Sequence, residues 1–391
     1  MKKHQYLIVG GGMTAAAAME GIRQADPQGD VGVISAEPSP PYDRPPLSKQ
    51  LWTGKKDIDE IWRSVPEGIP IYHGRKAVEL DLEGKMVTDQ EGETYSYDRL
   101  LLATGGRPRR LPFGDEKIIY YRTIEDFRRL ESLVESHSRF AVIGGGFIGS
   151  ELAAALAMKG KQVSILFPGT GIGDRMFPAD LSQFLNDYYR RHGVEVLAGE
   201  KAVGLDGNGT DLTLLTDRDR RISVEGVVAG IGIEPNTGLA QSAGLNIDNG
   251  IVVDEHLRAS QPHVFAAGDV ASFSDPLLGR RRVEHEDAAN SMGEAAGRSM
   301  AGEAAAYEYS PMFYSDLFDM GYEAVGDLDA RLETVADWQE PFRKGVVYYL
   351  KEGRVRGVLL WDIWGQVDAA RELMADQTPA TGDTLIGRLP V

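Results

Sequence analysis

Two glycine-rich turns of the same build constrain this chain more than any other feature. They lie in YLIVGGGMTAAAAMEGI and FAVIGGGFIGSELAAAL, where the small residues of a G-x-G-x-x-A/G pattern are Gly10, Gly12 and Ala15, then Gly144, Gly146 and Gly149. Each turn follows an apolar run and opens an alanine-rich segment, which predicts a strand, a tight turn and a helix. Two such units predict two dinucleotide sites, an arrangement typical of enzymes that transfer electrons between two cofactors.

A pyrophosphate needs backbone N–H donors, the positive end of a helix and no side chain in the way. In each turn the first glycine permits the sharp bend, the second lets the backbone approach phosphate, and the third small residue lets helix and strand pack closely. A simple strand-to-helix link is the alternative for either turn alone. The expected binding residues are Gly10, Gly12, Met13, Thr14, Ala15, Gly144, Gly146, Phe147 and Ile148.

Composition excludes several chemistries. The 391 residues include no cysteine, so this chain forms no redox-active disulfide and supplies no thiolate to a cluster or to zinc. The seven histidines show no ligand spacing, and no metal is expected. A net charge of −17 disfavours nucleic acid, anionic membranes and acidic protein partners, unless basic residues cluster as in residues 107–110 and 280–282.

The N-terminal residues MKKHQ lead directly into the first strand, and no apolar run reaches the length of a membrane span. We therefore expect a cytoplasmic protein. At 391 residues, two or three domains are expected.

The first unit reads as a strand over 6–9, a helix over about 13–25 and a strand over 31–35. Glu37 then stands where an acid can hold the adenosine ribose, although a surface glutamate is the alternative. The Pro-rich stretch PSPPYDRPPLSKQLW predicts a long irregular loop of the kind that tends to carry function.

Residues 70–98 read as short strands with a hairpin around 90–93, and the apolar run that follows ends at Ala103, Thr104 and Gly105. In HVFAAGDVASF, a strand leads to Gly268 and then to Asp269 at a helix start. An acid at such a place can bind a polyol, here the ribityl chain of a flavin, or can act only as a helix cap.

The predicted fold is α/β, with two Rossmann-like dinucleotide-binding domains and a C-terminal α+β domain with an antiparallel sheet. The second unit interrupts the first: the expected domains are 1–110 with 240–308, 111–239, and 309–391. In the last domain, YEAVGDL, LETVADW, GVVYYLK and VRGVLLW read as strands, and 365–374 as a helix. The last 15 or so residues are expected to be loose.

These segments resemble the FAD-dependent pyridine-nucleotide oxidoreductases of the glutathione-reductase structural class. Within that class they are most similar to apoptosis-inducing factor and its bacterial relatives, followed by bacterial ferredoxin and rubredoxin reductases. The resemblance spans nearly the whole chain and is carried by PPYDRPPLSKQLW, ATGGRPRRL, RTIEDFRRL, IGGGFIGSELAAAL, GIGIEPN, AAGDVASF, GRRRVEHEDAANS, YSDLFDMGYEAVG and RKGVVYYLKEGRVRGVLLWDIW.

The resemblance implies FAD and NADH as cofactors, with NADPH open, and a site assigned by position. Matching FAD-contact positions are Gly10, Gly12, Glu37, Arg44, Lys49, Val78, Arg122 and Asp269. Glu284 and His285 match a pair at the flavin ring and nicotinamide. Positions around NAD are Gly146, Phe147, Glu151, Gly232 and Glu323, with Trp361 and Asp362 as part of a wall.

The implied chemistry is hydride transfer from nicotinamide C4 to flavin N5, for which the protein sets distance and electrostatics. A buried ammonium at Lys49 would favour flavin reduction, and the family pattern makes Glu151 the partner that a buried lysine needs. Solvent-exposed positions are the alternative for both. Phe147 either guards the nicotinamide slot or packs in the core. His285 is expected to titrate near neutrality and make activity pH-dependent, or to be a structural histidine.

Three positions depart from the family pattern. Gly169 stands where an acid usually follows the second strand of the NAD unit, which removes both a ribose anchor and a repulsion against the 2′-phosphate of NADPH. Arg175 can serve either cofactor, and we expect NADH. Tyr314 replaces a tryptophan near the flavin, and Glu286 replaces a histidine after His285.

Three functions follow from the resemblance. The first is a FAD-dependent NAD(P)H oxidoreductase like apoptosis-inducing factor, without redox-active cysteines. The second is a reductase that passes electrons to ferredoxin or rubredoxin. The third is a flavoprotein whose NADH-bound state docks a partner or forms a homodimer. The acceptor stays open among ferredoxin, rubredoxin, quinone and O₂.

Overall fold

The computed structural model describes residues 1–303 and 305–390, which divide into two compact units. Unit 1 comprises residues 1–43, 58–107 and 234–312, and unit 2 comprises residues 44–57, 108–233 and 313–391. Each unit contains one of the glycine turns. The chain therefore builds a separate core around each predicted dinucleotide motif. The predicted α/β fold class is confirmed.

Unit 1 is built on a mostly parallel sheet in the order β3-β2-β1-β6-β5-β4, with β18 also paired to β6. Its elements include the predicted helix and the predicted hairpin, which joins β5 to β6. The bounds are β1 Lys2–Val9, α1 Met13–Ala25, β2 Val31–Ile34, β3 Ile71–Tyr72, β4 Ala77–Asp81, β5 Met86–Asp89, β6 Thr94–Leu102, α6 Gly238–Ser242, β17 Ile251–Val252, β18 Val264–Ala266, β19 Ala271–Asp275, β20 Gly279–Arg281 and α7 Glu286–Met300, with one-turn 3₁₀ helices η2 Ile58–Glu60 and η4 Gly268–Val270.

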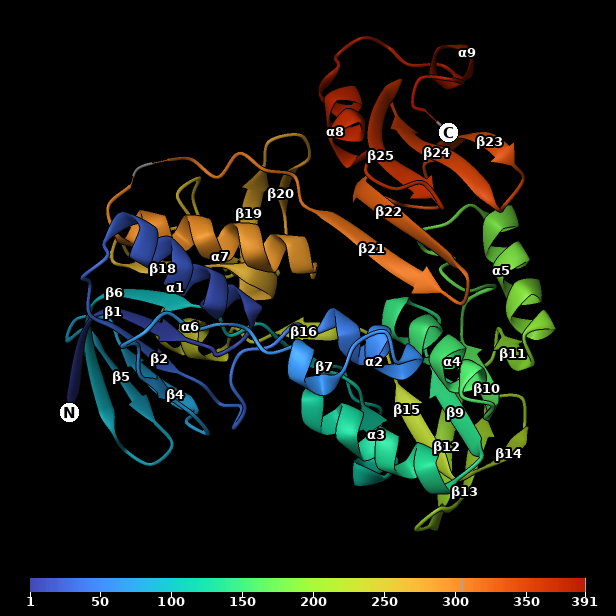
Figure 1. Cartoon of the computed structure of the whole chain (residues 1–391), viewed down its shortest axis with the longest axis horizontal. Coiled ribbons are helices and arrows are strands. Elements are labelled where there is room, and N and C mark those ends of the chain that lie inside the picture. The colour runs from blue at the N-terminus through green and yellow to red at the C-terminus, as the bar shows by residue number, and fades with distance from the viewer. Residues whose placement is uncertain (304, 391) are drawn as a thin grey trace. The chain divides into compact units, whose positions relative to one another are not determined.

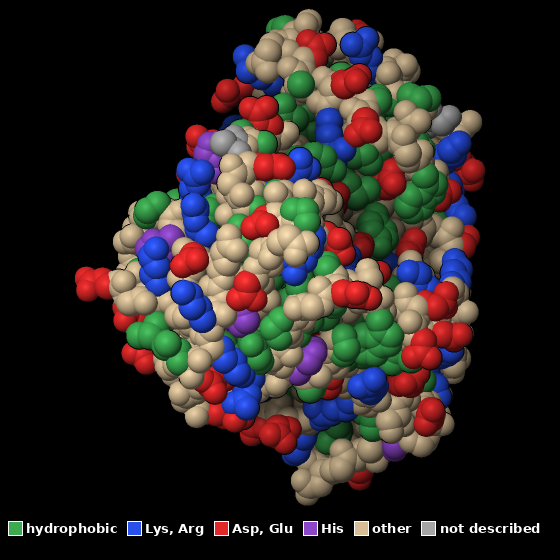
Figure 2. All heavy atoms as spheres, turned by 60° about the vertical axis from the view of Figure 1, so that its left-hand side comes forward, with side chains coloured by type: hydrophobic (Ala, Val, Ile, Leu, Met, Phe, Trp, Pro, Cys, Tyr) green, Lys and Arg blue, Asp and Glu red, His purple; other side chains and the backbone are tan. Residues whose placement is uncertain are grey.

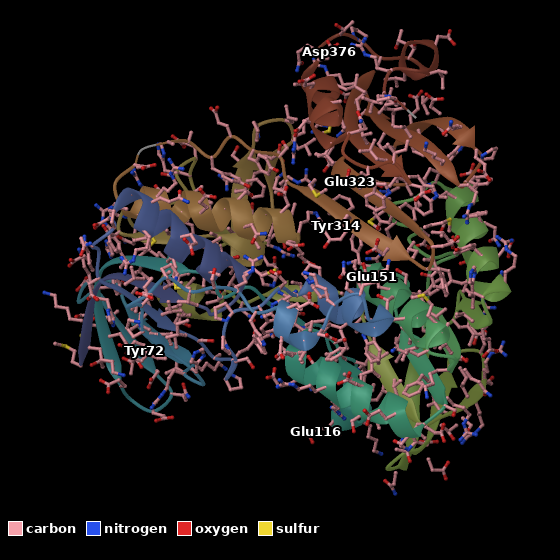
Figure 3. All side chains as sticks on the ribbon, in the orientation of Figure 1. Tyr72, Glu116, Glu151, Tyr314, Glu323 and Asp376 are labelled. Atoms are coloured by element: carbon pink, nitrogen blue, oxygen red, sulfur yellow. The ribbon has the colours of Figure 1, made fainter. Side chains whose placement is uncertain are left out.

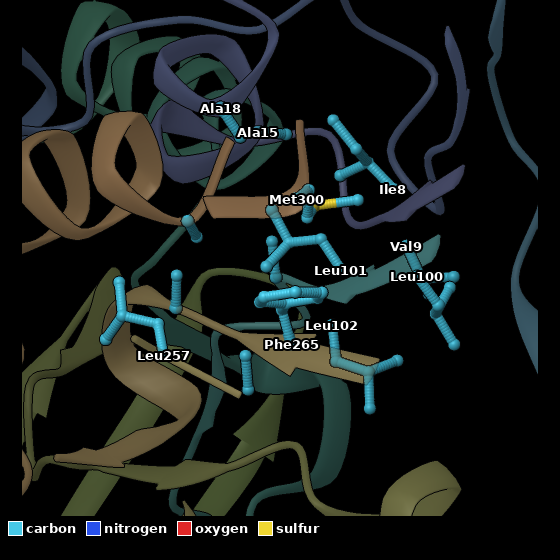
Figure 4. Packing of buried hydrophobic residues seen from close by; sticks show 14 of the residues in the cluster. Ile8, Val9, Ala15, Ala18, Leu100, Leu101, Leu102, Leu257, Phe265 and Met300 are labelled. Carbon is cyan, nitrogen blue, oxygen red and sulfur yellow. The ribbon is translucent and has the colours of Figure 1, made fainter. Parts of the chain in front are cut away.

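Helices α1 and α7 lie side by side in unit 1 (Figure 1). Their backbones approach so closely that a Cβ on Gly297 would lie 2.2 Å from the Ala18 carbonyl oxygen. Figure 4 shows how Ile8, Leu101, Phe265 and other apolar side chains fill the core of this unit. The alanine-rich sequence of α1 is thus explained, because only small residues permit this helix–helix distance.

Unit 2 contains a parallel sheet in the order β11-β10-β9-β15-β8, a three-stranded sheet β12-β13-β14 and an antiparallel sheet β21-β22-β25-β24-β23. The bounds are η1 Pro45–Ser48, α2 Gln50–Thr53, η3 Asp115–Lys117, β8 Ile118–Tyr120, α3 Ile124–Ser136, β9 Arg139–Ile143, α4 Phe147–Met158, β10 Gln162–Phe167, α5 Ala179–Arg191, β11 Val194–Ala198, β12 Ala202–Asn208, β13 Asp211–Thr216, β14 Arg221–Val224, β15 Gly226–Ala229, β21 Met312–Leu317, β22 Met320–Gly326, β23 Glu333–Glu340, β24 Lys344–Lys351, β25 Arg354–Trp361, α8 Val367–Ala375 and α9 Gly382–Leu385. Two short strands, β7 Gly106–Pro108 and β16 Ile233–Pro235, span boundaries between the units, and the first residue of β21, Met312, is the last residue of unit 1.

The antiparallel C-terminal sheet is confirmed, but the expectation of a loose C-terminal end is wrong. A capping box at Thr381 starts α9, and the side chains of Leu385 and Leu389 are almost completely buried. The N–H of Gly387 donates to the Asp337 carboxylate of β23 at 2.7 Å. The sequence of this segment is mostly polar, which led to the expectation of a loose end. The burial of Leu385 and Leu389 nevertheless holds the segment in place.

Candidate functional site

The first glycine turn has the geometry that a pyrophosphate site requires. Gly10 has φ of +123°, and a Cβ there would lie 2.1 Å from the Ala103 carbonyl oxygen. Gly12 caps α1 in an extended conformation. A Cβ on Gly268 would lie 2.2 Å from Thr14 Oγ1. Unit 1 therefore brings the turn, the end of β6 and the Gly268 segment together, as expected for one dinucleotide site.

The remaining unit 1 residues surround this turn in different ways. Glu37 follows β2 by three residues, and its Oε2 accepts a hydrogen bond from the Tyr42 hydroxyl at 2.6 Å. Asp269 lies within the one-turn helix η4 and does not cap it; its carbonyl accepts from Arg282 Nη1 at 3.0 Å. Val78 is 53% exposed on β4. Thr104 donates to the Asn236 carbonyl at 2.9 Å, which fixes the segment through Gly105.

His285 immediately precedes α7, and its electrostatic surroundings oppose protonation. Desolvation of the imidazole and the nearby charge of Arg281 lower the pKa of His285 to about 4, although Asp269 acts in the opposite direction. The expectation that this residue titrates near neutrality is therefore wrong. Its ring stays neutral at physiological pH. Glu284, the other member of the predicted pair, is exposed and forms a 2.8 Å ion pair with Arg282.

The second glycine turn shows which glycines serve packing and which do not. Gly144 has φ of +116°, and a Cβ on Gly149 would lie 1.9 Å from the Gly144 carbonyl oxygen. A Cβ on Gly146 would meet no atom within 4 Å. Since packing does not require glycine at position 146, its open space at the N-terminus of α4 fits an approaching phosphate. Gly232, with φ of +91°, accepts from the Arg109 N–H at 2.9 Å.

The most unusual cluster of unit 2 surrounds Glu151 on α4 (Figure 3). Its Oε1 lies 2.8 Å from Lys49 Nζ, and the two side chains are only 2% and 8% exposed, respectively. Ser48 donates to Oε2 and Ser315 donates to Oε1, each at 2.5 Å. A buried carboxylate with one ammonium and two hydroxyl donors is a charge-balanced and well-satisfied arrangement. The solvent-exposed alternatives for Lys49 and Glu151 are excluded.

Aromatic side chains enclose this cluster. Lys49 Nζ lies 5.0 Å from the centre of the Tyr314 ring, within the range of a cation–π interaction. Burial, followed by the negative charge of Glu151, raises the pKa of Tyr189 and of Tyr322 well above its usual range. These tyrosines therefore stay protonated, and Lys49 supplies the positive charge that balances Glu151.

Sequence reasoning missed Ser48 and Ser315. Ser48 directly precedes Lys49, so its position next to a predicted site residue could have indicated its role. Ser315 lies on β21, 164 residues from Glu151, and no local pattern connects the two. Contacts of this kind depend on tertiary packing alone.

The other predicted residues of unit 2 have varied surroundings. Phe147 is partly exposed and contacts Phe313 edge-on, with ring centres 5.5 Å apart. Arg44 Nη1 donates to the Arg122 carbonyl at 2.9 Å. Glu323 accepts from the Gly365 N–H at 2.8 Å.

Trp361 has no exposed surface and stacks on Tyr322 with ring centres 5.6 Å apart. Its side chain belongs to the core of the C-terminal sheet, because it occupies an inward-facing position on β25. The prediction that it forms part of a ligand wall is therefore corrected. Asp362, next in sequence, is partly exposed with φ of +52°, and Arg175 is exposed.

Two glycine turns at parallel sheets, a buried Lys–Glu pair and an antiparallel C-terminal sheet define a flavin- and pyridine-nucleotide-dependent oxidoreductase. Residues 4–295 match the family model described as pyridine nucleotide-disulphide oxidoreductase. Residues 296–341 and 336–376 match the C-terminal domain of mitochondrion-associated apoptosis-inducing factor. The chain belongs to the pyridine nucleotide-disulphide oxidoreductase family, whose cofactors are FAD and NAD(P)H.

Individual relatives agree with this assignment. The chain is 35% identical to apoptosis-inducing factor 1, mitochondrial, from Dictyostelium discoideum, over 96% of this chain and 79% of that protein. It is 34% identical to the ferredoxin reductase subunit of 5,5'-dehydrodivanillate O-demethylase from Sphingobium sp., over 97% and 95%. Among solved structures, putidaredoxin reductase in its covalent complex with putidaredoxin matches with a TM-score of 0.90, 28% identity and coverage of 97% and 94%.

Among the described residues, no helix combines the length and hydropathy needed to cross a bilayer. In the same part of the chain, no group of three or more acidic or histidine side chains is arranged to hold a metal ion.

Proposed function

We propose that this FAD-dependent NAD(P)H oxidoreductase uses Lys49 and Glu151 as the polar centre of its reaction site. Bound FAD would supply the chemistry of a hydride acceptor for NAD(P)H and of an electron donor to a further acceptor. The observation that carries the proposal is the buried 2.8 Å pair between Lys49 and Glu151, supported by Ser48 and Ser315.

Lys49 has the properties required of a residue that stabilises negative charge on a reduced cofactor. Its ammonium is held in a position where water scarcely reaches it, so its charge is weakly screened. Glu151 holds that ammonium in place through the 2.8 Å contact, and the two serine hydroxyls orient Glu151 in turn. We therefore assign a catalytic role to Lys49 and a positioning role to Glu151.

In unit 1 the residues that would hold FAD are those of the first glycine turn, with Glu37 at the ribose and Asp269 at the ribityl chain. In unit 2 Gly146 and the N-terminus of α4 would hold the pyrophosphate of NAD(P)H. His285 would offer a neutral ring to its ligand, since its pKa is about 4. The chain has no cysteine, so we propose electron transfer without a thiol step.

A ferredoxin or rubredoxin reductase is the second candidate, because relatives are named for that activity and one solved neighbour is in complex with putidaredoxin. Residues 107–110 and 280–282 are the two basic clusters that the sequence offers for docking an acidic partner. In the second cluster, Arg280 donates to the Ser272 carbonyl at 2.7 Å, Arg281 lies 3.8 Å from the Asp275 carboxylate, and Arg282 pairs with Glu284. Because these three arginines already have partners within the chain, less of their positive charge is available to bind an acidic partner protein.

The visible surface agrees with this assessment. On the face shown in Figure 2, basic and acidic side chains are interspersed. We therefore favour the oxidoreductase function that resembles apoptosis-inducing factor. An NADH-dependent homodimer and a cytoplasmic location remain predictions of the sequence.

Anaerobic titration of the flavin-loaded protein with NADH tests the proposal. The oxidised flavin absorbance should bleach in proportion to added NADH, and Lys49→Ala should slow this step in stopped-flow measurements. A protein that binds no flavin, or whose flavin NADH never reduces, would contradict the function. Stimulation of cytochrome c reduction by an added ferredoxin would instead support the second candidate.

A further inference from the structure

The strand registers of the two units identify equivalent positions after their second strands. In unit 1, Val9 precedes the glycine turn and pairs with Ile34, and Glu37 lies three residues after Ile34. In unit 2, Ile143 precedes the turn and pairs with Leu166, and Gly169 lies three residues after Leu166. The contacts of the middle glycine of each turn support the same equivalence. A Cβ on Gly11 would contact Ser35, one residue after Ile34, and a Cβ on Gly145 would contact Phe167, one residue after Leu166. Gly169 therefore occupies the position of the ribose-binding acid, as the sequence suggested.

The carboxylate of Asp174 fills the space that a side chain at this position would enter. An ideal Cβ on Gly169 would lie 2.0 Å from Asp174 Oδ2. That oxygen accepts a hydrogen bond from the Thr170 N–H at 2.7 Å. A side chain at position 169 would therefore have to displace the Asp174 carboxylate, which already lies there. The acid absent from the usual position is supplied from five residues further along the chain.

Asp174 is also tied to the second glycine turn. The adjacent Gly173 N–H donates to the Gly145 carbonyl at 2.9 Å, and Gly146 next to it is exposed with open space above. Asp174 is partly exposed, and within the described ranges 1–303 and 305–390 its Oδ1 has no hydrogen-bond partner. A fixed acceptor therefore remains available beside the place where a phosphate fits.

Two basic residues lie near this carboxylate. Arg175 follows it directly and is exposed. Gly199 donates to the Gly169 carbonyl at 2.8 Å, and a Cβ on Gly199 would lie 2.9 Å from the Arg218 guanidinium. Within the part of the chain that the structure describes, neither arginine forms an ion pair with Asp174. The Asp174 carboxylate lies at position 169, whereas Arg218 belongs to the turn between β13 and β14 and approaches Gly199.

We propose that Asp174 is the residue that selects NADH over NADPH. Its Oδ1 accepts hydrogen bonds from the adenosine ribose hydroxyls, and its charge repels the 2′-phosphate, which carries about −1.5 to −2 charges at neutral pH. This inference rests on the proposed function, in which unit 2 binds the nicotinamide dinucleotide at Gly146.

Asp174→Asn tests this role with little risk to the fold, since the amide oxygen can still accept from Thr170. Calorimetric titration of the flavin-loaded protein with NAD⁺ and with NADP⁺ measures binding without turnover. The wild type should bind NAD⁺ more tightly than NADP⁺. In the variant the ratio of the two affinities should fall about tenfold or more, because one hydrogen bond to a charged group contributes about that factor to binding. Asp211→Asn, on an exposed residue of β13, removes one charge elsewhere in unit 2 and should leave the ratio unchanged.

The double variant Gly169→Glu/Asp174→Ala moves the acid to its usual position and should restore the preference for NAD⁺. An unchanged ratio in Asp174→Asn, or a wild type that prefers NADP⁺, would overturn the assignment while leaving dinucleotide binding intact. If the wild type binds neither dinucleotide, the proposed function fails, and the role of Asp174 fails with it.

Discussion

The Glu151 carboxylate and the Lys49 ammonium lie 2.8 Å apart, and both side chains are almost completely removed from solvent. Two charges in such a place are stable only as a pair, because each would otherwise pay the full cost of dehydration. Glu151 comes from α4, Lys49 follows η1, and Ser315 on β21 completes the cluster. The packing of three segments that are far apart in the sequence of unit 2 therefore depends on the ion pair between Lys49 and Glu151.

Replacing Lys49 by methionine should destabilise the protein and slow its reaction with NADH. The unpaired Glu151 carboxylate is expected to lower the free energy of unfolding by about 3 kcal/mol, measured by urea denaturation. Flavin reduction should slow at least about tenfold, as for other preorganised charge-stabilising groups. Lys55→Met, on an exposed lysine that follows α2, is the control. Loss of rate with unchanged stability would contradict the buried-pair argument.

The variant Glu151→Gln and the double variant Lys49→Met/Glu151→Gln complete a thermodynamic cycle. The double variant should lose at least about 1 kcal/mol less stability than the sum of the single variants, since contacting residues are not additive. Strictly additive losses would show that the two charges do not interact.

Gly146→Ala and Gly149→Ala should have opposite consequences. The added methyl group at position 146 meets open space, so stability should change by less than about 1 kcal/mol. Nicotinamide dinucleotide binding should weaken, because that methyl group enters the phosphate site. At position 149 the methyl group would lie 1.9 Å from a carbonyl oxygen, and the protein should unfold more readily. Thermal denaturation and NAD⁺ titration distinguish these effects, and normal NAD⁺ affinity in Gly146→Ala would argue against the site.

The pH profile of flavin reduction should show no step from His285 between about pH 6 and 9. A ring with a pKa of about 4 is neutral throughout this range and gains its proton only as the pH falls toward that value. Because the unfolded-state pKa is near 6.5, the residue should reduce stability progressively as the pH falls from about 6.5 to 4. His285→Gln should flatten that loss, whereas His73→Gln, at an exposed position, should not. A titration near pH 6.5 that His285→Gln abolishes would contradict the low pKa.

The C-terminal segment offers a matched pair of neighbouring residues. Leu385 is 1% exposed, and Ile386 is 54% exposed. Leu385→Ala should lower the free energy of unfolding by about 2 kcal/mol or more through lost burial and the cavity that remains. Ile386→Ala should change it by less than about 0.5 kcal/mol. Equal effects in chemical denaturation would show that this segment is not anchored by Leu385.

Local features of this protein were readable from its amino-acid sequence. The glycine turns, the helix over 13–25, the hairpin after β5 and the C-terminal strands all follow from backbone requirements and side-chain periodicity, which act over a few residues. The absence of cysteine likewise decided which redox chemistries are closed to the chain. The family resemblance then pointed to Lys49 and Glu151.

The tertiary structure determined the burial, the charge partners and the pKa of these residues. Burial makes Lys49 and Glu151 an obligatory pair, desolvation lowers the pKa of His285, and packing removes Trp361 from the surface. Folding also brings the Asp174 carboxylate to the position left open by Gly169. Hydration and electrostatic energies depend on every atom packed around a group, and those atoms come from segments far apart in the sequence. No local pattern could have predicted them.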